Sequence, residues 1–315
     1  MPRFLAAIML VAACAPRDPF PLPQGEPGVQ AVSLLGDSLI PVRPSDSVWA
    51  VQRTQLDSAH AALVTDPASP DAWIWLGRRL AYLGYYRPAI AAYATALASY
   101  PGDARLLRHR GHRYITVRDL DAAIADFVAA AKLVQELPDE IEPDGQPNAR
   151  GIPTSTLQFN IWYHLGLAHY LKGDFPRALS AYRECLKVSG NPDALVATSH
   201  WLYMTLRRLG EREEAERVLL PITADMDVIE NGAYHRLLLM YKGEVAPEDL
   251  LPRDEAADAV QNATVAYGVG NWWLYSGDTT RALDVFRGIL RGSQWAAFGA
   301  IAAEADLARI GTPAN

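Results

Sequence analysis

His109 and His112 are the pair of side chains whose spacing best suits metal binding. They stand three residues apart, which would place both imidazoles on one face of a helix. A protein zinc site takes three or four ligands, and no carboxylate or thiolate close in sequence completes this pair. We therefore expect no metal ion and no cofactor.

A serine in the N-terminal region stands in a sequence that could hold a nucleophile. The residues Gly36-Asp37-Ser38-Leu39 are similar to the signature of the GDSL esterases, where the serine lies on a strand-to-helix turn of an α/β fold. That family places the partner Asp and His near the C-terminus. No Asp-x-x-His occurs in the last hundred residues, and nothing after the motif has an α/β pattern. We expect no enzyme activity.

Cys14 ends a short N-terminal segment that has the features of an export signal. Arg3 provides a positive start, and residues 4–13 form an uncharged, largely apolar run that is too short to span a bilayer. The run ends in Val11-Ala12-Ala13-Cys14, which resembles the lipobox of bacterial lipoproteins. The resemblance implies a signal peptide over 1–13 and lipidation of Cys14. Ala15 would then favour the periplasmic face of the outer membrane, because the residue after the cysteine is not Asp.

The composition describes the body that such an anchor would carry. The chain has 315 residues, is 50% apolar and has a formal charge of −7. That charge disfavours a general nucleic-acid binder, which needs a cationic surface. Residues 14–45 are rich in proline, which predicts an extended tether that holds the body away from the membrane. The prolines are Pro16, Pro19, Pro21, Pro23, Pro27, Pro41 and Pro44.

A spaced pattern of apolar, small and aromatic residues recurs along the rest of the chain. Counted from Pro70 as position 1, the first copy has Trp73, Leu76, Gly77, Leu80, Gly84, Tyr86, Ala89, Tyr93, Ala96 and Pro101 at positions 4, 7, 8, 11, 15, 17, 20, 24, 27 and 32. This resembles the tetratricopeptide repeat (TPR), a pair of helices of about 34 residues. Repeats are expected near 70–103, 104–137, 159–192, 196–228, 229–251 (degenerate) and 263–292.

The resemblance implies an all-α fold, an α-solenoid of about six TPR-like helix pairs over residues 46–312. Small residues at positions 8 and 20 would let the two helices of a repeat approach closely, and the aromatics would fill the space around that contact. Residues 48–63 and 293–310 are expected to form capping helices, because a helix pair cannot bury its own apolar face without a neighbour. Cys185, at position 27, is expected in the core.

In proteins of this family the first helix of each repeat lines a concave groove, chiefly at positions 2, 5, 9, 12 and 13. Carried over to this chain, those positions are cationic and aromatic, although the whole chain is acidic. Arg and Tyr are frequent anchors of binding surfaces. The predicted groove residues are Arg78, Tyr82, Arg105, Arg108, His112, Asn160, Tyr163, Tyr170, His200, Arg207, Arg208, Tyr267, Asn271 and Tyr275.

An insert over 138–158 separates the second repeat from the third. It is rich in proline, glycine and acidic residues, and it ends at Ser155 or Thr156, either of which can cap the next helix. Long loops inside compact domains are usually functional or disordered. We expect this one to be functional, as an acidic lid over the groove.

These features predict a membrane-anchored scaffold of the bacterial cell envelope that binds a protein or peptide in its groove. The partner would carry an acidic or C-terminal carboxylate segment, and the only contact with the membrane would be the lipid. The alternative is a glycan- or small-ligand-binding outer-membrane lipoprotein, for which the insert and Trp272 are the supporting features.

Overall fold

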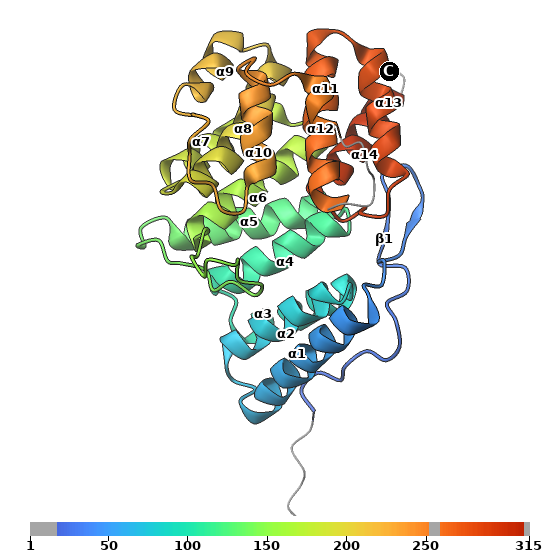
Figure 1. The fold of residues 1–315 in the computed structure, drawn as a ribbon. Helices are drawn as coiled ribbons and strands as arrows, with labels where there is room; N and C mark the ends of the chain where they lie inside the picture. The colour runs from blue at the N-terminus through green and yellow to red at the C-terminus, as the bar shows by residue number, and fades with distance from the viewer. Residues whose placement is uncertain (1–17, 252–258, 312–315) are drawn as a thin grey trace, which may run out of the picture.

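The computed structural model describes residues 18–251 and 259–311. Over these residues the chain forms fourteen helices and one two-stranded hairpin, and the helices stack in pairs (Figure 1). The elements, in chain order, are β1 (Ala31–Val32), β2 (Ser38–Leu39), α1 (Asp46–Thr65), α2 (Pro70–Tyr82), α3 (Tyr86–Ser99), α4 (Ala104–Thr116), α5 (Leu120–Val134), α6 (Leu157–Lys172), α7 (Phe175–Lys187), α8 (Pro192–Leu209), α9 (Arg212–Leu219), α10 (Gly232–Tyr241), α11 (Pro247–Leu250), α12 (Ala259–Ser276), α13 (Thr279–Leu290) and α14 (Phe298–Gly311).

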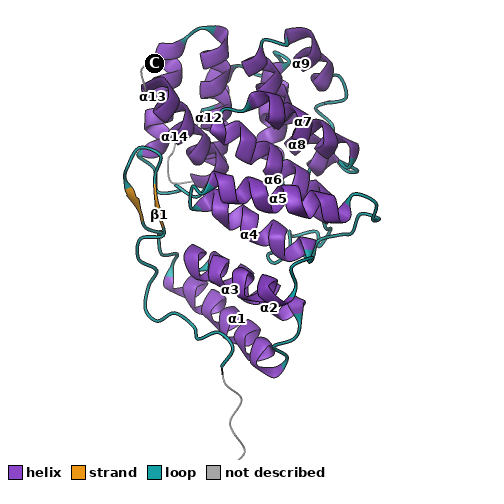
Figure 2. Cartoon of the chain, turned by 180° about the vertical axis from the view of Figure 1, so that it is seen from behind, coloured by secondary structure: helices purple, strands orange, loops and turns teal. Residues whose placement is uncertain are grey.

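The all-α solenoid predicted from the sequence is confirmed. Five predicted repeats correspond to the pairs α2–α3, α4–α5, α6–α7, α8–α9 and α12–α13. The degenerate fifth repeat has only α10 and the four-residue α11. Viewed from behind, the helices lie in successive layers along the molecule (Figure 2).

Position 8 of the repeat has no room for a side chain. A Cβ on Gly77 would lie 2.3 Å from the ring of Tyr93, and one on Gly166 would lie 2.7 Å from the ring of Tyr182. Gly111 against Phe127 and Gly270 against Phe286 repeat the arrangement at 2.9 and 2.8 Å. The glycine at position 8 therefore accommodates the aromatic ring at position 24 of the same repeat.

Position 15 shows where the chain departs from the repeat pattern. Gly84, Gly173, Gly210 and Gly277 occupy it with φ between 77° and 97°, a conformation that suits glycine. In the second repeat the position is Arg118, with φ 68°, the one non-glycine residue with positive φ in the described part of the chain. Its guanidinium forms a buried ion pair with Glu304 of α14, 2.7 Å from Nη2 to Oε2. An arginine is required here because a glycine could not reach α14.

The C-terminal helix α14 is more than a cap. It packs against α12, α13 and α6, and its residues 299–306 are all buried. Phe298, at its start, contacts the rings of His112, Tyr163 and His164. The helix therefore fills part of the concave side of the solenoid.

The tether predicted over 14–45 is wrong for residues 18–45, which lie along the body. Phe20 packs edge-on against Trp73, and the Tyr85 hydroxyl donates to the Gly25 carbonyl. The β1–β2 hairpin, blue in Figure 1, lies beside the C-terminal helices, where the Leu34 amide donates to Glu304 Oε1 at 2.6 Å. Proline disfavours a helix, but an extended proline-rich segment can still pack against the helices. We call residues 18–45 the strap.

The strap also explains the Gly36-Asp37-Ser38-Leu39 motif. Gly36, with φ 96°, lies in the turn of the hairpin, and the Ser33 hydroxyl accepts from the Asp37 amide at 3.0 Å. The motif is thus a hairpin turn followed by strand β2. This is not the strand-to-helix turn that the esterase reading requires.

Two further expectations concern cysteines and the membrane. Cys185 is fully buried, as expected, and burial raises the pKa of its thiol to about 12. None of the helices described here is both long enough and apolar enough to cross a bilayer. The predicted signal segment 1–13 and Cys14 lie outside the described residues.

Candidate functional site: an arginine-lined cavity

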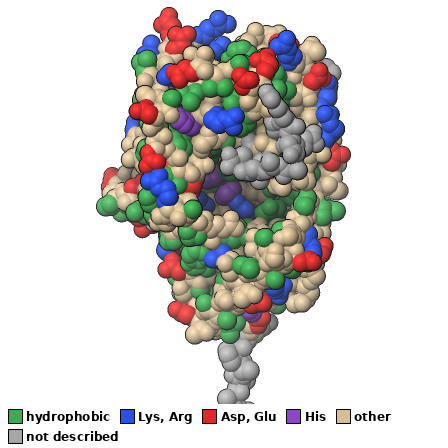
Figure 3. All heavy atoms as spheres, in the orientation of Figure 1, with side chains coloured by type: hydrophobic (Ala, Val, Ile, Leu, Met, Phe, Trp, Pro, Cys, Tyr) green, Lys and Arg blue, Asp and Glu red, His purple; other side chains and the backbone are tan. Residues whose placement is uncertain are grey.

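A cavity of about 140 Å³ lies on the concave side between α2 and α4. Figure 3 shows a hollow in this face, with Lys or Arg and His side chains in its depth. We call it the arginine cavity and define it by its lining: Arg78, Ala81, Tyr82, Tyr93, Arg108, His109, His112, Arg113 and Glu142.

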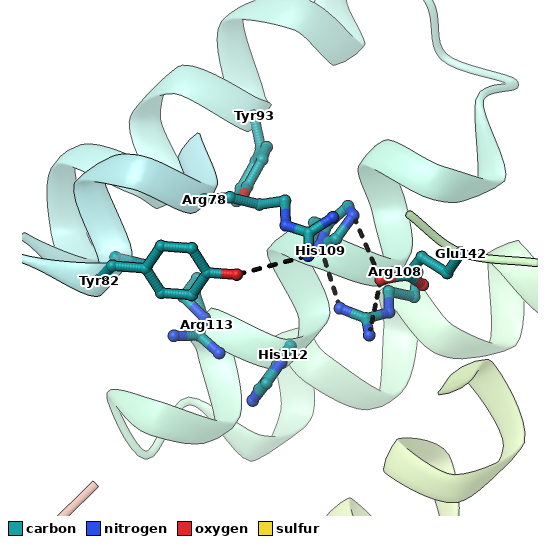
Figure 4. A pocket seen from close by; sticks show the side chains of 9 residues that line it. Arg78, Tyr82, Tyr93, Arg108, His109, His112, Arg113 and Glu142 are labelled. Atoms are coloured by element: carbon teal, nitrogen blue, oxygen red, sulfur yellow. Dashed lines mark hydrogen bonds and ion pairs between the residues drawn. The ribbon is translucent and has the colours of Figure 1, made fainter. Parts of the chain in front are cut away.

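Helix periodicity brings these side chains together. Arg78 and Tyr82 are four residues apart on α2, so they lie on the same face. On α4, Arg108 and His112 are four residues apart, and so are His109 and Arg113. All four side chains face α2 across the cavity (Figure 4). Asp103 fixes the start of α4, where its side chain accepts from the amides of Arg105 and Leu106.

Arg78 makes neutral contacts only. Its Nη1 donates to the carbonyl of Pro143 at 2.5 Å, and its Nη2 donates to the Tyr82 hydroxyl at 3.4 Å. The guanidinium carbon lies 4.6 Å from the centre of the Trp75 ring. The charge of Arg78 is therefore not balanced by a carboxylate among the described residues.

Arg108 is the most enclosed cation of the cavity. Its Nη2 lies 2.9 Å from Glu142 Oε1, and only 9% of its side chain is exposed. Its Nη1 donates to His109 Nδ1 at 3.0 Å, which leaves the proton of that imidazole on Nε2. The remaining donor, Nε, is buried and has no hydrogen-bond partner.

Arg113 is the third arginine of the cavity. It lies 5.6 Å from the centre of the Tyr86 ring, and no carboxylate in the described residues lies within ion-pair distance of it. Burial lowers the pKa of both Arg108 and Arg113, and the nearby Arg78 charge lowers both further. A guanidinium still keeps its proton at neutral pH. Three cations and one carboxylate thus leave two positive charges in excess.

The two histidines of the cavity are neutral. Burial lowers the pKa of His109 and of His112 well below the usual value, and the neighbouring arginine charges lower them further. The ring of His112 also lies tilted against that of His164, with ring centres 4.5 Å apart. In the described residues no group of three or more His, Cys, Asp or Glu side chains is placed to hold a metal ion.

The insert over 138–158 lies against this cavity, as the sequence led us to expect. Beyond the Arg108–Glu142 pair and the Arg78–Pro143 bond, Arg79 Nη1 donates to the Gly145 carbonyl at 3.1 Å. On the opposite side Arg150 pairs with Asp227 at 2.7 Å. Thr156 caps α6 by accepting from the Phe159 amide. The insert therefore spans from α2 to the loop before α10.

Comparison with known proteins identifies the repeat. Residues 159–192, which form α6 and α7, match the family model of the tetratricopeptide repeat. This helix pair is a tetratricopeptide repeat, and the pairs α2–α3, α4–α5 and α12–α13 have the same two-helix architecture. No curated protein matches the sequence.

Solved structures of TPR proteins are among those that are similar to this chain. One is YrrB, described as a TPR protein with an unusual peptide-binding site, with 15% identity, a TM-score of 0.42 and coverage of 78% of this chain and 98% of that one. Another is a TPR protein of Parabacteroides merdae, with 17% identity, a TM-score of 0.49 and coverage of 82% and 94%. At these identities the likeness concerns the fold alone.

Of the groove residues predicted on α2 and α4, all but one line the same cavity. Arg78, Tyr82, Arg108 and His112 line the arginine cavity. Arg105 points elsewhere and pairs with Asp71 at 2.6 Å and with Asp103 at 2.7 Å.

The groove residues predicted on α6, α8 and α12 mostly lie in the interior, which corrects the extent of the groove. Asn160 is buried and donates to Glu142 Oε2 at 3.1 Å, so it positions the insert. Arg207 and Arg208 are partly buried, and Arg207 lies 4.4 Å from the centre of the Tyr275 ring. Two helices cover these positions: Tyr234 and Tyr241 of α10 stack on His200, and Asp306 of α14 binds Arg208 and Tyr267. The fully buried members are Tyr163, Tyr170, His200, Tyr267 and Asn271.

The predicted groove set leaves out five residues that line the cavity, among them Ala81 and His109. Arg113 and Tyr93 do not stand at groove positions of the TPR pattern, and Glu142 belongs to the insert. One signal was available for Arg113: residues 105–113 contain four arginines and two histidines, far more charge than one exposed helix face needs.

Proposed function

We propose that this TPR protein is a scaffold that binds an acidic peptide segment at the arginine cavity. The single observation that carries the proposal is that the cavity already holds such a segment, its own residues 142–145. Glu142 pairs with Arg108, while the carbonyls of Pro143 and Gly145 accept from Arg78 and Arg79. A side-chain carboxylate and two main-chain carbonyls are groups that any acidic peptide can offer.

An acidic partner can compete with the insert for the arginine cavity. Glu142 neutralises one of three cations, so a partner with more than one acidic group would balance more of the charge. The insert is attached at both ends, which gives its acidic segment a high local concentration. Only a partner with better complementarity would displace it, and this would provide selectivity.

We also propose that the chain is anchored by a lipid on Cys14 in the bacterial cell envelope, at the periplasmic face of the outer membrane. The support is Val11-Ala12-Ala13-Cys14 followed by Ala15. Asp18 already contacts His60 at 3.0 Å, and four residue steps reach at most about 14 Å. The body would then lie close to the bilayer rather than on a long tether. A Cys14→Ser variant should leave the membrane fraction; if it stays there, the anchor is elsewhere.

We assign no catalytic step to the protein. Ser38 follows a hairpin turn, Cys185 is a buried thiol with a raised pKa, and the histidines of the cavity are neutral and buried. The glycan alternative loses one of its two supports, because Trp272 packs partly buried against the main hydrophobic core. An exposed aromatic face is what sugar stacking requires.

The proposal is tested by cross-linking capture from solubilised membranes. Arg78→Glu should abolish recovery of partners, because it places a negative charge where the acidic segment binds. Arg207→Glu makes the same charge change on α8, outside the arginine cavity, and should retain capture. Circular dichroism checks that both variants fold. Equal recovery by the parent and by Arg78→Glu would show that the binding face is elsewhere.

A further inference from the structure

Beneath the insert, the arginine cavity has donors that the insert does not use. Arg108 Nε is buried without a partner, although the rest of that guanidinium is bound to Glu142 and His109. Arg113 forms no ion pair with a described residue, and its contact with Tyr86 is through the ring face. A buried donor without a partner is costly, so such groups usually mark a place where something else binds.

The charge and shape of the cavity restrict what that ligand is. Two positive charges remain in excess after Glu142 is counted. The donors come from several directions: Arg78 and Tyr82 from α2, and Arg108, His112 and Arg113 from α4 (Figure 4). A planar carboxylate carries one charge and binds in one plane, whereas a tetrahedral oxyanion carries up to two charges and accepts from all sides.

We propose that the arginine cavity is a binding site for a doubly charged tetrahedral oxyanion, a phosphate or phosphoryl group, held by Arg78, Arg108 and Arg113. The volume of about 140 Å³ is large enough for an ion of this size. Glu142 keeps its contact with Arg108 Nη2 at 2.9 Å, and Asn160 donates to its second oxygen at 3.1 Å. The oxyanion and the acidic peptide therefore share Arg78 and Arg108, whereas Arg113 serves the oxyanion alone.

Arg113 is the residue on which the test depends. It has no carboxylate to lose in the described residues, so Arg113→Gln removes a ligand contact without breaking an ion pair. Arg105→Gln is the matched control, since it makes the same change on the same helix at a residue paired with Asp71 and Asp103, outside the cavity.

Isothermal titration calorimetry with inorganic phosphate, at constant ionic strength, measures the binding. The parent and Arg105→Gln should bind phosphate saturably at one site, and Arg113→Gln should bind at least about tenfold more weakly. Acetate under the same conditions should give no saturable heat. Phosphoserine is titrated in parallel: tighter binding than phosphate indicates a group borne on a larger molecule, and weaker binding indicates the free ion.

Three results would overturn the oxyanion site. They are acetate binding as tightly as phosphate, an equal loss in Arg105→Gln and Arg113→Gln, or no loss in Arg113→Gln. None of them bears on peptide capture, because that experiment uses Arg78→Glu and scores recovered protein. The two proposals can therefore fail separately.

Discussion

The N-terminal and C-terminal halves of the concave side carry similar side chains, but their arginines have different partners. On α8 and α12, Arg208 is bound by Asp306 at 2.8 Å, and Tyr267 donates to the same carboxylate at 2.9 Å. On α2 and α4, Arg78 and Arg113 have no described carboxylate, and Arg108 has only Glu142. The C-terminal half is part of the core, and the N-terminal half is lined with uncompensated charge.

The difference comes from where the carboxylates originate. Helix α14 supplies Asp306 to Arg208 in the C-terminal half and Glu304 to Arg118, just after α4, as a fixed part of the fold. The arginine cavity receives its one carboxylate, Glu142, from an insert whose residues 139–142 are exposed or partly exposed. A helix packed on several others cannot leave without unfolding, whereas a loop can. Arginines therefore mark a binding surface only where no permanent partner covers them.

The largest expected effect tests the ion pair that joins the end of α4 to α14. Arg118→Gly restores the repeat consensus and relieves a positive φ that costs about 1–2 kcal/mol. It also leaves Glu304 buried without its cation, which costs about 3–5 kcal/mol. We expect a net loss of stability in chemical denaturation. A variant more stable than the parent would show that α14 is only a loosely held cap.

Acidification should also weaken the filled half. Burial lowers the pKa of His200 to about 3, so the folded state stays neutral while the unfolded state gains a proton below about pH 6.5. Stability is therefore lost as pH falls from 6.5 toward 3, by about 2 kcal/mol at pH 5 from this residue. Denaturation at pH 7 and pH 5 should show a flatter dependence for His200→Asn. An unchanged slope would contradict the burial of a neutral imidazole.

Overpacking tests the scaffold that both halves share. Ala123, at position 20 of the second repeat, is fully buried, whereas Ala125 on the same helix is exposed. Ala123→Leu should cost about 1–3 kcal/mol, because the added volume forces α4 and α5 apart. Ala125→Leu should change the melting temperature little. Similar shifts for the two variants would contradict the repeat register.

The smallest effect is expected in the unfilled half. Arg113→Gln removes a partly buried cation with no described carboxylate, so stability should change by less than about 1 kcal/mol and in the favourable direction. This small change in stability contrasts with the large loss expected for Arg118→Gly, although both variants replace an arginine near the same end of α4. A loss as large as that of Arg118→Gly would mean that Arg113 has a structural role.

The repeat pattern predicted the fold well because its signal is local and periodic. Gly77 with Tyr93 and Gly111 with Phe127 each lie in one repeat, so their spacing alone encodes the contact. The pattern is degenerate in the fifth repeat, and there the structure has only the four-residue α11 as a second helix. Family positions also placed Arg78, Tyr82, Arg108 and His112 on one surface.

Contacts between distant segments could not be read in this way. The ion pairs Arg208–Asp306 and Arg118–Glu304 join residues far apart in sequence, and no local pattern indicates them. The packing of α14 onto the solenoid was therefore not predicted. The strap was missed because proline content excludes helix without saying whether an extended chain packs. Its contacts, such as the Trp295 indole donating to the Ile40 carbonyl at 2.8 Å, join residues far apart in sequence.

The central claim is that the arginine cavity binds acidic peptide segments, and its own insert provides the probe. Ile141 and Thr156 are bridge partners, so residues 142–155 can be replaced by an Asn-Gly turn that keeps the two ends paired. A fluorescent peptide of residues 138–151 is then titrated against this variant, with anisotropy as the readout. We predict saturable binding that is lost with Arg78→Glu and retained with Arg207→Glu. Equal binding by both charge-reversed proteins, or none by the insert-free protein itself, would contradict the account.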